Sequence, residues 1–455
     1  MRRGTIAERL VDYALALKYE DLPGEAVHEA KRRLVDSFAC MLGGYEAPPA
    51  KAAMRAAPVV TNGLASTIFG SPLPTTPEAA AFANGILVRY LDFNDTYLSK
   101  EPAHPSDNIP AALAAAQAAN AGGKELITAI VAAYEVQCRL CDAATLRTRG
   151  WDHVAYGAFS ATVAASMLLG LSRDEFINAI NIAGTVSPAL RQSRAGELSM
   201  WKGCAFANTS KDALFASIMA KNGITGPAPI FEGEFGFEKT VSGPLGLSET
   251  FGGEGGERFK ILDTYIKFYP AEYHSQSAIG AAVELVADIV DPKEIESVVV
   301  STFGAGFEII GSGDEKWRPR TRETADHSLP FLVAAALLDG NVNLATYSDR
   351  MEDPDLTTLI KKVRVVKDAE LDRMYPGAIP NRVEVKLSSG ELLTREMIYP
   401  KGHPKNAMTD RELEEKFKNL GGWYLGDGMA EKALSKLWKA EEAKSVMELL
   451  RLFMR

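Results

Sequence analysis

Cysteine, histidine and long apolar runs are scarce in this chain of 455 residues. Its four cysteines, Cys40, Cys138, Cys141 and Cys204, are too few and too scattered for a disulfide framework. Cys138 and Cys141 have CxxC spacing, but no second pair accompanies them, so we expect neither a structural zinc nor an iron–sulfur cluster. We expect a cytoplasmic protein whose fold depends on neither disulfides nor metal.

An excess of positive charge and a membrane-length apolar segment are also missing. The formal net charge is −9, which disfavours broad attraction to nucleic acid or to an anionic membrane. No run approaches the roughly 18 apolar residues that a membrane span needs, and the N-terminus lacks a signal-peptide core. We therefore expect neither nucleic acid nor a membrane as a partner, and if the substrate is an anion, a local basic cluster must hold it.

Helical periodicity dominates the first half of the chain. It predicts helices at residues 5–17, 23–42, 79–91, 110–120, 124–146, 151–169, 173–183 and 204–222. A cluster of glycines at 252–256 lacks the strand and helix that flank a dinucleotide-binding loop, so it indicates a domain boundary.

Strands enter only after this boundary. The pattern predicts helices at 275–290 and 325–338 and strands at 295–303, 359–366, 381–387 and 392–399, with a hairpin turn at Ser388-Ser389-Gly390. Helices at 410–420 and 428–454 close the chain. We thus expect a mainly α protein with a helical part at 1–260, an α+β domain at 261–400, and C-terminal helices at 401–455 that return to the helical part.

The most polar loop follows the helix at 79–91. Asp92, Asn94, Asp95 and Thr96 come within five positions, and His104 follows. Loops at helix ends let such side chains converge on a ligand. They also cap helices well, so two caps and a solvated linker are the alternative. Asp92, Asp95 and His104 have little metal specificity at this spacing, and we expect no metal.

Six histidines are present, at positions 28, 104, 153, 274, 327 and 403. His104, His274 and His327 each lie at a predicted element boundary beside other polar groups. For any one of them a buried capping histidine is the alternative. Three histidines in such positions favour a reactive site, because imidazole titrates near neutral pH.

The basic counterpart lies between two predicted helices. Arg191, Gln192 and Arg194 are followed by Lys202, just before a helix begins. Guanidinium groups and helix N-termini bind carboxylates, so this segment predicts an anion receptor. Surface salt bridges are the alternative reading.

Several ordered motifs together resemble the MmgE/PrpD family over essentially the whole chain. They are LDFNDT at 91–96, HPSD at 104–107, RQSRAGELSMWKGCAFAN at 191–208, GITGPAPIFEGEFGF at 223–237, IKFYPAEYHSQSAIGAA at 266–282 and WRPRTRETADHSLP at 317–330. The segments at 191–203, 268–276 and 322–330 look like the 2-methylcitrate dehydratase branch, and cis-aconitate decarboxylase is a relative.

The resemblance implies a large all-helical domain from both chain ends, a smaller α+β lid, and an active site between them. It also implies a homodimer and a reaction without an iron–sulfur cluster or other cofactor. Carried onto matching positions, the catalytic residues are Asp92, Thr96, His104, Lys202 and His274. Those expected to bind substrate are Asn94, Asp95, Arg191, Gln192, Arg194, Tyr269, Gln276, His327 and Ser328. Many relatives place a histidine where this chain has Gln276, and His274 lies two positions earlier.

The expected reaction is dehydration of the tricarboxylate 2-methylcitrate to 2-methyl-cis-aconitate, with citrate as a second candidate substrate. It removes a proton beside a carboxylate and protonates a departing hydroxyl. We predict that His104 transfers the proton, that Asp92 orients it or a substrate hydroxyl, and that Arg191, Arg194 and Lys202 hold carboxylates. Decarboxylation of cis-aconitate, epimerisation of a dicarboxylate and a non-catalytic helical scaffold are the alternatives.

Overall fold

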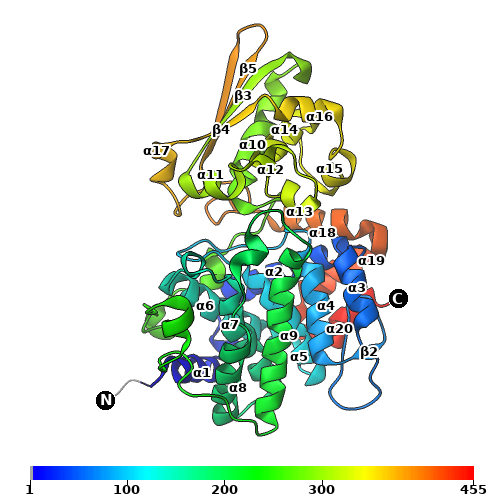
Figure 1. Ribbon diagram of the computed structural model, residues 1–455. Helices are drawn as coiled ribbons and strands as arrows, with labels where there is room; N and C mark the ends of the chain where they lie inside the picture. Colours follow the sequence, from blue (N-terminus) through cyan, green and yellow to red (C-terminus); the bar gives the residue numbers. More distant parts are fainter. Residues whose placement is uncertain (1–3) are drawn as a thin grey trace. The chain divides into compact units, whose positions relative to one another are not determined.

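Helices form most of this protein, as its computed structural model shows for the described residues 4–455 (Figure 1). The predicted mainly α fold class is confirmed. The chain divides into two compact units: unit 1 comprises Met1–Ala195, Met200–Thr264 and Thr409–Arg455, and unit 2 comprises Gly196–Ser199 and Tyr265–Met408. None of the described helices is long and apolar enough to cross a membrane.

Unit 1 is helical apart from one short antiparallel pair, β1 (Ser66–Thr67) with β2 (Pro74–Thr75). Its helices before the glycine-rich connector are α1 (Ile6–Ala16), α2 (Gly24–Gly43), α3 (Pro48–Ala56), α4 (Pro77–Arg89), α5 (Ile109–Ala118), α6 (Gly123–Ala143), α7 (Val154–Leu169), α8 (Arg173–Val186) and α9 (Trp201–Lys221). The C-terminal helices are α18 (Asp410–Leu425), α19 (Asp427–Leu437) and α20 (Met447–Leu450).

Helices α4 and α9 pack closely because small residues face each other (Figure 1). A Cβ atom added at Gly85 of α4 would lie 2.8 Å from the Cβ atom of Ala207 and 2.9 Å from its Cα atom. These helices carry two predicted site residues: Asp92 follows α4, and Lys202 lies in the first turn of α9. Their close contact therefore fixes the distance between those two residues.

Helix α18 joins the C-terminal segment to α2. It begins with a capping box, in which Thr409 Oγ1 accepts from the Glu412 N–H and Glu412 Oε2 accepts from the Thr409 N–H. A Cβ atom added at Gly43 of α2 would lie 3.0 Å from Leu420 of α18. Unit 1 thus takes residues from both ends of the chain into one packed core.

Unit 2 is built on a four-stranded sheet of order β4-β3-β5-β6 (Figure 1). The strands are β3 (Ile295–Thr302), β4 (Val363–Lys367), β5 (Asn381–Leu387) and β6 (Leu392–Met397); only β3 and β4 are parallel. The predicted hairpin between β5 and β6 is confirmed, with Gly390 at φ 89°. The helices are α10 (Gln276–Leu285), α11 (Gly304–Ile310), α12 (Asp314–Trp317), α13 (Arg322–Ala325), α14 (Leu329–Asp339), α15 (Leu344–Asp349), α16 (Pro354–Ile360) and α17 (Ala369–Asp372).

Two predicted elements of unit 2 are wrong in extent. The strand predicted at 359–366 begins only at Val363, because Pro354–Ile360 is helix α16. The Asp353 side chain caps that helix by accepting from the Leu356 N–H at 3.0 Å, and Pro354 fits its first turn. The helix predicted at 325–338 is divided, because Ser328 caps a new helix that starts at Leu329.

The long helix predicted at 428–454 is also wrong. It ends at Leu437, and only short helical turns follow. The backbone of this segment bonds instead to the start of α6: the Gly123 N–H donates to the Ala443 carbonyl at 2.8 Å, and the Val446 N–H to the Ala121 carbonyl at 2.9 Å. A Cβ atom at Gly123 would lie 1.6 Å from the Ala440 carbonyl oxygen, so this approach requires glycine.

Candidate active site

Asp92 lies between two cations in unit 1. Its carboxylate pairs with Arg89, at the end of α4, and Lys202 Nζ lies 3.5 Å from its Oδ2. All three side chains are at most 3% exposed. Asp92 also has φ 51°, in the left-handed region that few residues other than glycine adopt. Such a conformation at a buried ion pair is typical of a functional site.

His104 is oriented by hydrogen bonds at both ring nitrogens. Its Nδ1 lies 2.7 Å from the Asp95 carbonyl oxygen, and its Nε2 lies 2.9 Å from Arg89 Nη2. Arginine only donates, so Nε2 accepts and Nδ1 carries the proton. His104 is therefore a neutral imidazole whose Nε2 faces the same guanidinium that pairs with Asp92.

Thr96 supports this histidine from the same loop. Its Oγ1 donates to the Ala103 carbonyl at 3.1 Å and lies 3.3 Å from His104 Nδ1. The Tyr97 and Ala103 backbones form a short antiparallel bridge beside it. The hydroxyl of Thr96 thus holds the loop that presents His104.

His153 is a second imidazole beside His104. The two ring centroids lie 5.7 Å apart at 66°. His153 Nδ1 lies 2.7 Å from Asp152 Oδ1, and its buried Nε2 has no hydrogen-bond partner among the described residues. From the sequence, no role was predicted for His153. The adjacent carboxylate of Asp152 was the signal available for it.

Arg194 is held by that same carboxylate. Its Nε donates to Asp152 Oδ2 at 2.9 Å, and its Nη1 donates to the Lys202 carbonyl at 3.1 Å. Burial alone would raise the pKa of Asp152, but the charges of Arg194 and His153 and hydrogen bonds to the carboxylate hold this pKa well below its ordinary value. Asp152 is therefore an anion that fixes both Arg194 and His153.

Arg191 differs from Arg194. Its side chain is partly buried, yet it forms neither an ion pair nor a side-chain hydrogen bond within residues 4–455 as described. Burial lowers the pKa of Arg191, while Glu101 and Asp152 partly oppose this at longer range. The neighbouring Gln192 is exposed. Arg191 is thus a cation that a carboxylate ligand would satisfy.

Asn94 and Asp95 bond to the protein itself. The amide of Asn94 donates to Ser106 Oγ and to Asp107 Oδ1, each at 2.8 Å. Asp95 accepts from the Ser106 N–H at 2.9 Å and from the Tyr134 hydroxyl at 2.7 Å. These contacts hold the loop in place, and we assign both residues to loop geometry.

Asp107 is a buried carboxyl in the 3₁₀ turn Pro105–Asn108, which follows His104. Burial raises its pKa to about 7, although the charge of Arg89, whose Nε lies 3.7 Å from Oδ2, acts in the opposite direction. Burial likewise raises the pKa of Asp95, against the opposing charge of Arg33. The site therefore contains an acid that titrates near neutral pH.

His274 lies in unit 2, in the 3₁₀ turn before α10. Glu272 accepts from the His274 N–H at 2.7 Å and lies 2.6 Å from its Nδ1, and His274 Nε2 is 3.4 Å from the Tyr375 hydroxyl. Burial would raise the pKa of Glu272, but the charges of His274, His327 and Lys267 lower it. His274 is thus oriented by a carboxylate, as His153 is in unit 1.

Gln276 shapes the loop before α10. Its Oε1 accepts from the Tyr269 N–H at 3.0 Å, and its Nε2 donates to the carbonyls of Tyr269 and Ala271 at 2.9 and 3.2 Å. Tyr269 is 8% exposed, and burial raises its pKa to about 12. Both the oxygen and the nitrogen of the Gln276 amide therefore bond to the backbone of this loop.

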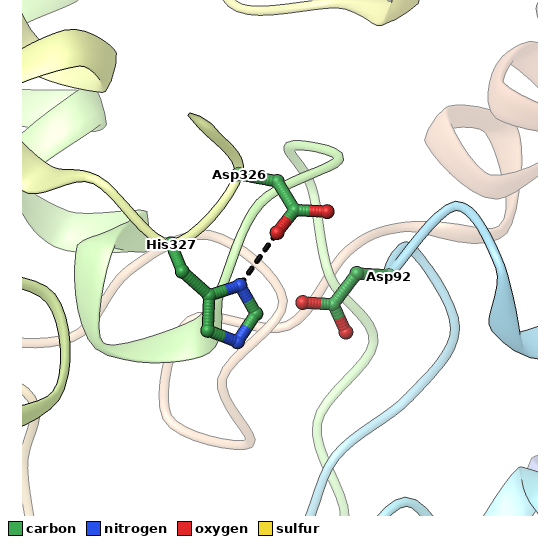
Figure 2. Close-up of side chains that lie close together, drawn as sticks. All are labelled: Asp92, Asp326 and His327. Carbon is green, nitrogen blue, oxygen red and sulfur yellow. Dashed lines mark hydrogen bonds and ion pairs between the residues drawn. The ribbon is translucent and has the colours of Figure 1, made fainter. Parts of the chain in front are cut away.

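His327 and Ser328 follow α13. His327 Nδ1 lies 2.5 Å from Asp326 Oδ1, the pair that the dashed line marks in Figure 2. Ser328 caps α14 by accepting from the Phe331 N–H at 3.1 Å and donates to the Lys316 carbonyl. Its hydroxyl is therefore used by the helix start, whereas His327 is a third carboxylate-oriented imidazole.

Family comparison identifies the class of protein to which this fold and these residues belong. Residues 8–250 match the MmgE/PrpD N-terminal domain, and residues 269–440 match the MmgE/PrpD C-terminal domain. The chain belongs to the MmgE/PrpD family.

Relatives within that family are similar over most of their length. The 2-methylcitrate dehydratase of Cupriavidus necator is 29% identical over 87% of this chain and 85% of its own. That of Salmonella typhimurium is 30% identical over 90% of this chain and 88% of its own. A cis-aconitate decarboxylase-like protein, oryM of Aspergillus oryzae, is 26% identical over 99% of this chain and 97% of its own.

Proposed function

We propose that this protein is a 2-methylcitrate dehydratase, which forms 2-methyl-cis-aconitate by removing water. The observation that carries the proposal is the buried cluster of Lys202, Asp92, Arg89 and two adjacent imidazoles in unit 1. The names of the relatives supply the substrate. A tricarboxylate needs cations, and removal of a proton beside a carboxylate needs a base of near-neutral pKa.

Arg191 is the proposed carboxylate clamp. A guanidinium binds a carboxylate through two parallel hydrogen bonds, and this one has no competing ion pair among the described residues. Lys202 adds positive charge beside Asp92. These cations stabilise the charge that develops on the substrate carboxylate as the neighbouring carbon loses its proton.

His104 and His153 are the proposed proton-transfer residues. His104 is neutral, with Nε2 against Arg89, and the unpartnered Nε2 of His153 is suited to accept a proton. Asp152 stabilises the imidazolium that His153 becomes, as the carboxylate of a catalytic triad does. The proton leaves the substrate carbon for an imidazole, the C–O bond breaks, and the hydroxyl departs as water after protonation by an acid, for which Lys202 is the candidate. The predicted roles of His274 and His327 stay predictions.

Replacement of each imidazole tests this assignment. His104→Ala and His153→Ala should each lower kcat at least about 100-fold, with a smaller change in KM. Exchange of the substrate C–H proton with deuterated solvent should be lost in the variant that lacks the base. Near-normal turnover in both variants would move the base to His274.

We also propose that the reaction needs no metal. Asp92 faces Arg89 and Lys202, whereas Asp95 faces Tyr134 and the Ser106 N–H, so these carboxylates are satisfied by protein groups. The first assay follows the absorbance of the new conjugated double bond with 2-methylcitrate and a strong chelator. An absorbance rise supports a metal-independent dehydratase, and activity only after metal is restored would contradict it.

A second candidate is decarboxylation of cis-aconitate, because oryM carries that name. Product analysis separates the two reactions, since only decarboxylation releases carbon dioxide. The same absorbance assay with citrate measures the preference for 2-methylcitrate over citrate, because the one methyl group by which they differ is worth about 1–3 kcal/mol in a pocket. We further propose that the protein is cytoplasmic and forms a homodimer, and sedimentation of the purified protein tests the homodimer.

A further inference from the structure

One buried cation of unit 1 contacts the backbone of the Asp92 loop from the far end of the chain. Lys416, in α18, is 6% exposed. Its Nζ lies 2.6 Å from Asp36 Oδ1 in α2 and donates to the Phe93 carbonyl at 2.7 Å. The same ammonium lies 3.7 Å from the centroid of the Phe93 ring. Two helices from opposite chain ends thus hold one peptide group.

Stability alone does not explain this arrangement. Taking an ammonium and a carboxylate out of water is costly, and a well-packed apolar pair of similar volume is often as stable or more so. A buried polar pair whose groups are satisfied rigidifies the structure around it. What Lys416 fixes here is the carbonyl of Phe93.

The Phe93 carbonyl belongs to the residue directly after Asp92, whose backbone is in the left-handed conformation. Asp92 has φ 51°, and such a conformation persists in a residue other than glycine only where the surroundings determine it. The Asp92 N–H donates to the Arg89 carbonyl at 3.0 Å, and Lys416 holds the Phe93 carbonyl on the other side. The peptide groups on both sides of Asp92 and Phe93 are therefore anchored.

The direction of the Asp92 carboxylate follows from that backbone. The left-handed conformation points it at Arg89 and at Lys202, whose Nζ is 3.5 Å away. A shift of about 1 Å in a catalytic group can cost about 100-fold in rate. We propose that Lys416 is a positioning residue of the active site, which with Asp36 holds the Phe93 carbonyl so that Asp92 stays aligned with Lys202.

This inference deepens the proposed function, and its kinetic consequences rest on that function. Lys416 does not touch the reacting atoms in this account, since it acts through Asp92. The substrate clamp Arg191 is left intact when Lys416 is changed. A loss of alignment should therefore lower kcat and leave substrate binding nearly unchanged.

The first experiment compares Lys416→Met with Lys418→Met in the full-length protein. Lys418 lies on the same helix and is exposed, with its Nζ 3.8 Å from Glu431 Oε1. For Lys416→Met we expect kcat with 2-methylcitrate to fall at least about tenfold and KM to change less than about threefold. Lys418→Met should match the wild type. Unchanged kcat in a folded Lys416→Met protein would overturn the inference.

A double-mutant cycle separates positioning from general destabilisation. Asp92→Asn alone should lower kcat strongly, and Lys416→Met added to it should cost less than about twofold more, because residues that act as a unit are not additive. Lys416→Arg, which retains a cationic donor, should recover part of the lost rate. Full multiplication of the two single losses would show that Lys416 does not act through Asp92.

A structural readout decides the inference without turnover. In a crystal structure of Lys416→Met, Asp92 should leave the left-handed region or its carboxylate should move away from Lys202. Retention of both features would overturn the inference.

If the wild type turns over neither 2-methylcitrate nor citrate, the proposed function fails, and this structure still tests the positioning role. Should Lys416→Met not fold, the Asp36→Asn/Lys416→Met double variant leaves no unpaired buried charge and still lacks the donor to Phe93.

Discussion

Arg191 differs from the other cations discussed above in its contacts with carboxylates. Arg89, Arg194 and Lys202 each lie within 4.0 Å of a carboxylate, whereas the Arg191 side chain has no such partner among the described residues. Its charge is therefore available to a bound anion. The other three cations are paired with carboxylates of the protein itself.

Arg191→Ala should raise KM at least about tenfold with little change in kcat, because a charge-assisted hydrogen bond is worth about 1.5–3 kcal/mol. Steady-state kinetics with 2-methylcitrate measure both constants. Arg149→Ala is the matched control, since Arg149 is an exposed arginine of the preceding 3₁₀ turn. A fall in kcat at constant KM would instead give Arg191 a role in the chemical step.

Asp107 makes the stability of the protein depend on pH. Its pKa is about 7 in the folded protein against an ordinary value of 3.8, so the folded state binds the proton more tightly. The stabilisation that this proton provides is fully present below pH 3.8 and is lost as pH rises through about 7.

Asp107→Asn should remove this dependence, because the amide stays neutral and its oxygen can still accept from Asn94. Urea unfolding at pH 5 and pH 8 measures the effect. The wild type should lose free energy of unfolding relative to the variant between those values, by about 1 kcal/mol or more. An equal change in both proteins would show that the protonation of Asp107 does not change differently in the folded and unfolded states over this range.

The sequence predicted which loops carry polar side chains, but it did not predict the hydrogen-bond partner of each polar atom. The Asp92 loop, His104 and the basic segment at 191–202 were identified from residue type and position. The partners of Asn94 and Asp95 lie at Ser106, Asp107 and Tyr134, and one-dimensional spacing does not contain such contacts. The proximity of His153 to His104 was not predicted for the same reason, because it depends on how helices pack.

At the scale of elements, the contact between α4 and α9 brings Asp92 and Lys202 together. Gly85 allows the backbones to approach, and the residues that follow or begin these helices are Asp92 and Lys202. Sequence patterns located both helices to within a few residues. They did not show that the two helices touch at Gly85, because a small residue in a helix is compatible with many neighbours.

Gly85→Ala should destabilise the protein by about 1–3 kcal/mol and lower kcat, since the new Cβ would lie 2.9 Å from a backbone atom of α9 and the helices must separate. Thermal unfolding and kinetics measure both effects. The control is Gly24→Ala at the start of α2, where nothing lies within 4 Å of the added atom. Wild-type activity in Gly85→Ala would show that the site tolerates this separation.

Capping signals explain which element boundaries were predictable. The capping box at Thr409 starts α18 at the residue that periodicity indicated. Asp353-Pro354 is an equally good start signal, but the apolar residues after it resembled a strand and concealed α16. The break after Leu437 carried no local signal, because its backbone partners are Ala121 and Gly123.

At the scale of the whole molecule, the two units differ in how the chain forms them. Nearly all of unit 2 is one continuous segment, Tyr265–Met408, whereas unit 1 needs Thr409–Arg455 in addition to the N-terminal residues. The buried pair of Lys416 and Asp36 spans this division of unit 1. Composition and resemblance predicted the class of fold but gave no such contact.

A chain that ends at Met408 should lose cooperative unfolding of unit 1, because α18 is removed from α2 and Asp36 becomes a buried unpaired charge. The segment 265–408 expressed alone should still fold, since its apolar cluster is internal. Circular dichroism melts of both proteins check this. Wild-type unfolding of the shortened chain would contradict the assigned role of the C-terminal helices.

The pairing of Asp36 with Lys416 also bears on how the protein is made. A ribosome adds about 5–20 residues per second, so Asp36 in α2 is synthesised roughly tens of seconds before Lys416. During that interval the helices of unit 1 lack their final packing surface, while unit 2 is synthesised entire before α18 emerges. The later-encoded unit is thus able to fold first, and the early helices complete their packing only after α18 has been synthesised.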